Sequence, residues 1–225
     1  MVVLLVPMLI KYQFIMDLKV FTYNCRGLPK SKKRLSLRPD IGQIFDDAHI
    51  VAFQETWFSK QDLNCLNSLH DNYFGFGVAK VDESLGLIQG RYSGGVAIMW
   101  KKELSRNIKV LDLNVNWCVA IEFDVGCTRF VLFNIYMPYQ TIANEDEYIE
   151  KLGYIKCFID ELNCTNYAII GDWNANLGNS GTMTFKAFFV GITNFLYHRK
   201  YYYLIQHTHI LILMKEICTT HGLIT

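Results

Sequence analysis

The stretch of residues 167–176 constrains the fold more than any other part of the chain. Residues 168–170 are apolar and predict a short buried strand. Gly171 interrupts this run, and Asp172 and Asn174 follow at alternating positions. A buried strand that ends in a carboxylate and amides places polar groups at the rim of a sheet, where ligands are commonly held. Because Gly, Asp and Asn are also ordinary turn residues, this stretch alone leaves a plain turn as an open interpretation.

Two earlier predicted strands also end in polar side chains. Residues 17–24 alternate roughly between apolar and polar side chains and end at Asn24. Residues 49–55 form a second apolar strand that ends in the carboxylate of Glu55. Three strands that end in the same way favour a shared site over three unrelated turns.

The remaining pattern predicts an α/β fold. Apolar residues at helical spacing predict helices over 36–48, 63–69 and 145–162, and further strands are predicted over 73–77, 93–100, 109–113, 118–124 and 128–136. The last of these strands places Asn134 and Tyr136 on one face, because residues two apart share a face. The order strand, helix, strand, several strands, helix, strand indicates two sheets packed face to face with helices outside.

Composition sets limits on class and partners. A chain of 225 residues, 51% of them hydrophobic, is expected to be one globular domain rather than a disordered segment. Its net charge of +1 excludes a strong global field, so any contact with nucleic acid must rest on a local patch. The basic loop at residues 30–34, with Arg38, is the candidate patch, either as a phosphate contact or as ordinary solvated surface.

The cysteines and the N-terminal residues bear on the compartment. The seven cysteines are scattered and form no Cys-x-x-Cys pair, which favours a reducing compartment over a disulfide framework or zinc site. Residues 1–10 are apolar but lack a preceding basic residue, a following cleavage site and the length of a membrane span. We therefore expect residues 1–15 to be an extension and residues 16–225 to be the domain.

Four short motifs, in order, resemble the endonuclease/exonuclease/phosphatase superfamily of DNase I-like and apurinic-site nucleases. They are Tyr-Asn-Cys-Arg-Gly at 23–27, Gln-Glu-Thr at 54–56, Asn-x-Tyr-x-Pro at 134–138 and Gly-Asp-Trp-Asn-Ala at 171–175. Asn-Cys-Arg-Gly-Leu at 24–28 and Arg-Tyr-Ser-Gly-Gly-Val-Ala-Ile-Met-Trp at 91–100 look most like the endonuclease domain of non-LTR (LINE-type) retrotransposons. The resemblance covers about residues 17–180.

The resemblance implies a four-layer α/β sandwich that hydrolyses phosphodiesters with Mg²⁺, or with Mn²⁺ in its place. Carried over by residue, Glu55 is the main metal ligand with Asn24 beside it, and Asp172 orients or activates the attacking water. Asn174 holds the scissile phosphate, and Tyr136 lies against it. A hard cation suits these oxygen ligands. Further contacts to substrate are expected from basic side chains, namely Arg26, Lys32, Lys33 and Arg34.

The chain departs from this pattern in its last third. The family's later Ser-x-x-Asp segment and its terminal Ser-Asp-His, which supplies a coupled base, have no counterpart here. We therefore expect a sandwich that is truncated at the C-terminus, with an atypical or inserted segment at 182–212 and a helix beginning near Leu213. His207 and His209 suggest a metal pair, but they precede an apolar run, and we expect them to be a structural or incidental pair.

Three functions stay open at this point: a DNA endonuclease, a catalytically inactive remnant of one, and a phosphatase acting on phosphoinositides or sphingolipids. The retrotransposon-like motifs and the basic loop favour nucleic acid over lipid. The missing terminal motif favours the remnant. The expected partner is DNA, with no membrane and no protein partner inferred. The expected location is intracellular, and nuclear for a copy that acts on DNA.

Overall fold

The structure, a computed structural model, describes residues 2–10, 14–85, 92–125, 128–139, 141–163, 166–175, 204–207 and 210–214. Two mixed sheets form its centre. The first sheet has the order β1-β2-β3-β5-β4, with β1 at Val2–Ile10, β2 at Phe14–Asn24, β3 at Ile50–Gln54, β5 at Val96–Lys101 and β4 at Tyr73–Val78. The second sheet has the order β10-β11-β9-β8-β7-β6, with β10 at Leu204–His207, β11 at Ile210–Met214, β9 at Tyr167–Asp172, β8 at Thr128–Tyr136, β7 at Cys118–Val125 and β6 at Ile108–Leu111.

The two sheets pack face to face through one apolar layer. Alternating side chains of the central strands meet there, because successive residues of a strand point to opposite faces of the sheet. The first sheet contributes Leu18, Val20, Ile50, Ala52, Val96, Ile98 and Trp100, and the second contributes Val119, Ile121, Phe123, Phe130, Leu132, Ala168 and Ile170.

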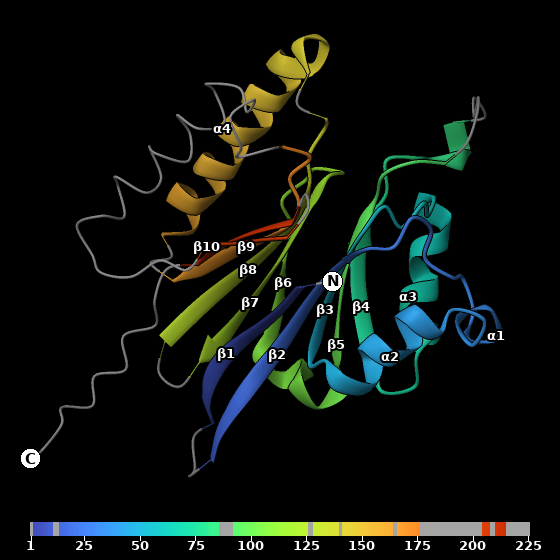
Figure 1. Cartoon of the computed structure of the whole chain (residues 1–225), viewed down its shortest axis with the longest axis vertical. Helices are drawn as coiled ribbons and strands as arrows, with labels where there is room; N and C mark the ends of the chain where they lie inside the picture. The colour runs from blue at the N-terminus through green and yellow to red at the C-terminus, as the bar shows by residue number, and fades with distance from the viewer. Residues whose placement is uncertain are drawn as a thin grey trace, which may run out of the picture.

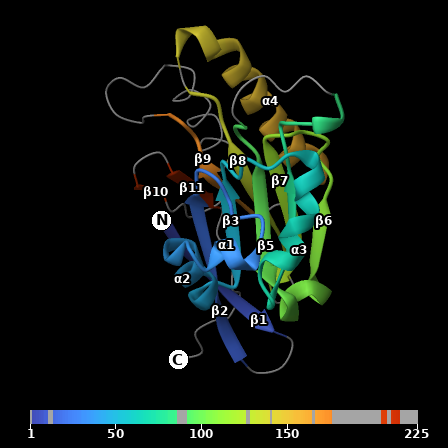
Figure 2. The same ribbon diagram turned by 90° about the vertical axis from the view of Figure 1, so that its right-hand side faces the viewer.

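Helices cover the two outer faces and complete the four layers (Figure 1). The first sheet is covered by α1 (Lys32–Leu35), α2 (Pro39–Asp47) and α3 (Leu66–Leu69), which lie in front of it in the turned view of Figure 2. The second sheet is covered by α4 (Glu145–Leu162). Short 3₁₀ turns, η1 to η4, lie at Lys60–Cys65, Glu83–Leu85, Lys102–Asn107 and Ile142–Asn144.

The sequence of each long helix explains which face it buries. Ile41, Ile44 and Phe45 of α2 recur at helical spacing and point into the outer core, and Pro39 occupies the first turn, where no N–H is needed. In α4 the buried residues are likewise spaced by three or four positions. That helix ends at Asn163, whose left-handed conformation closes it.

Two parallel strand pairs bring the polar strand ends together. β2 pairs with β3 so that Asn24 lies opposite Gln54, and β8 pairs with β9 so that Tyr136 lies opposite Asp172. Parallel strands deliver their carboxyl ends to the same edge of a sheet. The two edges face each other across the core, and all of the predicted strand-end residues therefore lie in one region.

The predicted α/β sandwich is confirmed, and several element bounds differ from the prediction. Part of the predicted basic loop is the short helix α1, which Ser31 caps through its side-chain oxygen. β5 begins at Val96, three residues later than predicted, because Gly94 and Gly95 adopt positive φ values. Leu213 and Met214 belong to β11 and not to the predicted helix.

The predicted extension at residues 1–15 includes β1, which pairs with β2 along its whole length, and the first residues of β2. Whether it is separate from the domain stays a prediction. Most of the predicted atypical segment at 182–212 lies outside the described residues, although β10 and the first residues of β11 fall within it. Within the described part of the chain, no helix is long and apolar enough to span a membrane.

Candidate active site

The amide of Asn24 joins two carboxylates from different sheets. Its Nδ2 donates to Glu55 Oε1 at 2.8 Å and to Asp172 Oδ2 at 2.7 Å. Asn24 ends β2 and Glu55 follows β3 in the first sheet, whereas Asp172 ends β9 in the second. The site is therefore built across the gap between the two sheets, and two negative charges converge on one point.

Tyr136 completes the group at the end of β8. Its hydroxyl donates to Glu55 Oε1 at 3.3 Å, so this oxygen accepts from two side chains. Burial raises the pKa of Tyr136, and the nearby charges of Glu55 and Asp172 raise it further. The phenol is therefore a protonated donor throughout the ordinary pH range.

Asp172 and Asn174 are held by the turn that follows β9. The backbone N–H of Asn174 donates to Asp172 Oδ1 at 3.0 Å, and Asn174 Nδ2 donates to the carbonyl of Met137 at 2.8 Å. The hydroxyl of Tyr148 on α4 donates to the carbonyl of Trp173 at 3.0 Å. This turn is nearly closed to solvent, with Asp172 5% and Asn174 7% exposed. The orientation of both side chains is thus fixed by backbone and core contacts.

Backbone strain concentrates at these strand ends. Glu55, Trp57, Arg26 and Asn174 have φ values of +53°, +55°, +46° and +46°. The left-handed region costs non-glycine residues roughly 1–2 kcal/mol each and is enriched at functional sites. The energetic cost is consistent with a backbone that is shaped to present side chains and not to maximise stability.

A buried polar network lies directly beneath the site. Gln54 Nε2 donates to Asn134 Oδ1 at 2.6 Å, and Asn134 Nδ2 donates to the carbonyls of Phe53 and Ala97 at 3.0 and 2.9 Å. Gln54 and Asn134 are fully buried, and they come from different sheets. Glu55 is the residue directly after Gln54, and Tyr136 lies two residues after Asn134. The network therefore fixes the distance between Glu55 in one sheet and Tyr136 in the other.

A basic groove of about 400 Å³ opens on one side of the site. Its lining residues are Arg26, Gly27, Leu28, Pro29, Lys30, Arg34, Arg38, Thr56, Trp57 and Tyr92. Of the predicted substrate contacts, Arg26 and Arg34 are here. Lys32 and Lys33 do not line the groove, and Lys32 forms an ion pair with Asp71.

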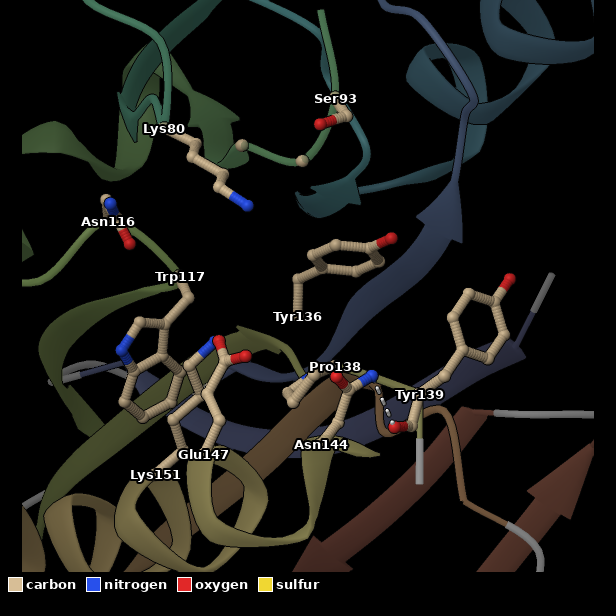
Figure 3. Close-up of a pocket in the computed structure, with 12 residues that line it drawn as sticks. Lys80, Ser93, Asn116, Trp117, Tyr136, Pro138, Tyr139, Asn144, Glu147 and Lys151 are labelled. Atoms are coloured by element: carbon tan, nitrogen blue, oxygen red, sulfur yellow. Dashed lines mark hydrogen bonds and ion pairs between the residues drawn. The ribbon is translucent and has the colours of Figure 1, made fainter. Parts of the chain in front are cut away.

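A second hollow, the Tyr136 cleft, lies on the other side (Figure 3). Its volume is about 440 Å³, and it is lined by Lys80, Ser93, Gly94, Gly95, Asn116, Trp117, Tyr136, Pro138, Tyr139, Asn144, Glu147 and Lys151. These residues come from five separate segments of the chain. Apart from Tyr136, none of them belongs to the predicted set of site residues.

Comparison with known proteins identifies the family. Residues 21–199, more than half of the chain, match the Endonuclease/Exonuclease/phosphatase family. This chain is a member of that family. The resemblance inferred from the four motifs is therefore confirmed. A search of curated proteins finds no match.

Solved structures with this fold include both nucleases and a phosphatase. The AP endonuclease LMAP from Leishmania major matches with a TM-score of 0.60 at 11% identity, over 86% of this chain and 78% of that one. The endonuclease domain of TRAS1, a telomere-specific non-LTR retrotransposon, matches with a TM-score of 0.54 at 12% identity, over 88% of this chain and 84% of that one. The mannosyl-6-phosphatase Bt3783 from Bacteroides thetaiotaomicron matches with a TM-score of 0.54 at 16% identity, over 87% of this chain and 84% of that one. At these identities the matches establish the fold alone.

Endonuclease/Exonuclease/phosphatase proteins generally depend on divalent metals, and the donor set of this chain suits one. Glu55 and Asp172 converge on one point, and the groups that join them, the amide of Asn24 and the phenol of Tyr136, are neutral. Mg²⁺ is usually bound by one or two carboxylates while it keeps several waters. Among the described residues, no group of three or more His, Cys, Asp or Glu side chains could form a full cage.

The histidines in the described part of the family domain lie away from this site. His49 accepts the backbone N–H of Lys19 at 3.0 Å, and His70 stacks on Phe45 with ring centroids 4.8 Å apart. The side chain of His207 and all of His209 lie outside the described residues, so the expectation of a structural or incidental pair stays a prediction.

All five predicted catalytic and metal-binding residues meet at one place in this member of the family, whereas the predicted basic contacts separate into two groups. The Tyr136 cleft and the Gln54–Asn134 network were not predicted as parts of a site. The alternation that places Asn134 and Tyr136 on one face was the only available signal for the network. Nothing local in the sequence points to the cleft, because its residues are scattered along the chain.

Proposed function

We propose that this chain is a divalent-metal-dependent phosphodiester hydrolase that acts on DNA, with an origin in a retrotransposon endonuclease. One observation carries the proposal. Asn24 holds the carboxylates of Glu55 and Asp172 together at the junction of the two sheets, with Tyr136 and Asn174 beside them. Two carboxylates, an amide and a phenol at one point can bind a cation and a phosphate together.

The proposed roles follow from the hydrogen bonds of each group. Glu55 would hold the metal together with the amide oxygen of Asn24, which accepts the backbone N–H of Arg26 at 3.3 Å, and the metal would offset the charge that develops on the phosphate and the leaving oxygen. Asp172 accepts from Asn24 and from a backbone N–H, so its carboxylate is fixed in place to orient the attacking water. One amide hydrogen of Asn174 is bonded to the Met137 carbonyl, and the other is available for a phosphate oxygen. Tyr136 stays protonated and acts as a hydrogen-bond donor. The water oxygen bonds to phosphorus as the phosphorus–oxygen ester bond breaks, and the proton that the water gives up beside Asp172 would end on the departing oxygen.

The basic groove supports DNA as the substrate. Arg26 and Arg34 lie in it and make no ion pair among the described residues. Arginine pairs well with phosphate oxygens, and a groove of cations next to a hydrolytic site suits a polyanionic strand. A phosphatase for a phosphoinositide or sphingolipid would use the same reacting groups, and only the shared fold of a phosphatase supports it. An inactive remnant is the further alternative, distinguished by the absence of turnover.

The test is nicking of supercoiled plasmid. We expect nicked circles to form with Mg²⁺ or Mn²⁺, to disappear with EDTA and to return when excess metal is restored. Asp172→Asn is expected to lower the rate by roughly 100-fold or more, because it loses the charge that orients the water. Agarose electrophoresis over time measures both effects.

Glu150→Gln is the matched control, since it also removes one carboxylate but lies on the exposed face of α4. Folding of each variant is checked by circular dichroism. A folded wild-type protein that releases phosphate from small phosphomonoesters and leaves plasmid intact would support the phosphatase. A folded protein that is inactive in both assays would be a remnant.

Tyr136→Phe tests the donor beside Glu55. Loss of one hydrogen bond to a charged group is expected to slow nicking roughly tenfold to a hundredfold. Because the pKa of Tyr136 is raised in the folded protein, its contribution is fully present below the usual tyrosine pKa and is lost only as the pH rises beyond it. The ratio of the nicking rate of wild type to that of Tyr136→Phe should therefore be constant between about pH 6 and pH 9. A ratio that falls steadily with rising pH in this range would contradict the assignment.

A further inference from the structure

The Tyr136 cleft and the basic groove flank the proposed reaction site and differ in their charge. Four cations line the basic groove, namely Arg26, Lys30, Arg34 and Arg38. In the Tyr136 cleft the charges are Lys80, Lys151 and Glu147, and the remaining polar groups are amides and hydroxyls. The loop at residues 92–95 separates the two hollows, since Tyr92 lines one and Ser93 the other. A strand that crosses the site between these two hollows would meet the Tyr136 cleft on one side and the basic groove on the other.

Among the described residues, Lys80 is the cation of the Tyr136 cleft that forms no ion pair. Lys151 Nζ lies 2.7 Å from Glu147 Oε1 and 5.4 Å from the ring centre of Trp117, so it is neutralised at the wall. Lys80 makes no ion pair among the described residues, and its ammonium points into the hollow between Tyr136 and Trp117 (Figure 3). Its charge reaches Glu147, whose pKa is lowered mainly by Lys151 and to a smaller extent by Lys80.

The backbone keeps the path from Tyr136 to Lys80 open. Gly94 lies between them at a φ of +70°, and a Cβ atom at this position would lie 3.8 Å from Lys80 Cβ and 3.9 Å from Tyr136 Cε1. Any longer side chain would stand between the two residues. A ligand group attached to a phosphate at Tyr136 can therefore extend directly to the Lys80 ammonium.

The other lining groups suit a nucleoside. Asn116 and Asn144 offer amide donors and acceptors, and Ser93 offers a hydroxyl. Asn144 Nδ2 donates to the Tyr139 carbonyl at 3.2 Å, so the amide is held in position at the rim. Tyr139 itself is 59% exposed. Sugar hydroxyls and base edges need such neutral polar partners, and a base can stack on an exposed ring.

We propose that the Tyr136 cleft binds the nucleotide next to the cleaved bond, and that Lys80 pairs with the phosphate that follows the scissile one. This inference rests on the proposed function. It assigns to Lys80 a positioning role, because it touches a phosphate that does not react. It also predicts that strand ends lacking this neighbouring phosphate bind less well.

The test is a salt titration of DNA binding in EDTA, with a short fluorescein-labelled duplex and fluorescence anisotropy. Wild type is compared with Lys80→Gln and with Lys109→Gln, a control that removes an exposed lysine of β6 outside both hollows. One lost phosphate contact changes the slope of log K against log salt by about 0.9. The ratio of the Kd values of variant and wild type should therefore shrink about 3.5-fold between 50 and 200 mM salt.

A second arm locates the phosphate. A neutral methylphosphonate is placed in turn on either side of the cleaved position. We expect it to weaken DNA binding by the wild type at one of the two positions, and to leave DNA binding by Lys80→Gln unchanged at that position. Lys80→Gln with the slope of wild type, or a wild type that does not bind the duplex, would overturn the inference. Because EDTA removes the metal, a slope change without any nicking would sustain the inference and reject the proposed activity.

Discussion

Replacing Glu55 by glutamine is expected to lower the rate of plasmid nicking roughly 1000-fold or more. The substitution preserves the shape of the side chain but replaces a carboxylate by a neutral amide at the proposed metal site. A bound metal supplies several kcal/mol of transition-state stabilisation, and each 1.36 kcal/mol corresponds to a factor of ten in rate. Among the described residues, Glu55 alone accepts hydrogen bonds from both Asn24 and Tyr136 at a single oxygen, Oε1.

A direct measurement of metal binding separates this explanation from a loss of fold. Titration calorimetry with Mn²⁺ should show a weaker Kd for Glu55→Gln than for wild type, with an unchanged circular dichroism spectrum. Glu150→Gln should match wild type in both measurements. If Glu55→Gln binds Mn²⁺ as wild type does and yet fails to nick, the residue serves the reaction in another way and the ligand assignment is wrong.

Gly171→Ala is expected to destabilise the folded protein by about 4 kcal/mol or more, a large part of the stability of a typical domain, which is roughly 5–15 kcal/mol. A Cβ atom at this position would lie 2.1 Å from the carbonyl oxygen of Ile135 and 2.8 Å from its nitrogen. The φ value of +131° also excludes most side chains. Because β8 and β9 pair in parallel at this point, neither strand can move away without losing ladder hydrogen bonds.

Gly153→Ala is the matched control. Gly153 lies within α4, and a Cβ atom there would meet nothing within 4 Å. That substitution should stabilise the protein by roughly 0.5–1 kcal/mol, because alanine favours a helix over glycine. Urea unfolding followed by tryptophan fluorescence compares the two. A Gly171→Ala protein whose unfolding midpoint equals that of wild type would refute the close approach of β8 and β9.

The parts of the site that could be predicted from the sequence are those at the ends of strands. Asn24, Glu55, Tyr136 and Asp172 each follow an apolar run, and strand periodicity is a local signal. Two parallel pairings then bring them together, as parallel strands must. The helix at 145–162 could also be predicted with its bounds, because its apolar stripe is long and regular.

The parts that could not be predicted depend on contacts between distant segments. The ion pair between Lys32 and Asp71 has no local signal, since the two residues are 39 positions apart. Lys80 gave no local signal, since its position opposite Tyr136 depends on the packing of both sheets. The positive φ of Glu55 is likewise imposed by the structure around it, because glutamate itself does not favour that conformation.

The hydrogen bond between Asn24 and Asp172 has a consequence for synthesis on the ribosome. These residues are 148 positions apart, so the contact forms only after β9 has emerged and docked beside the earlier strands. Contacts of such long sequence separation form slowly, because the chain loses much entropy before they contribute. A nascent chain that stops before β9 therefore contains Glu55 but lacks Asp172, and it has no assembled site. Unfinished polypeptides of this kind are therefore expected to be inactive in the proposed reaction.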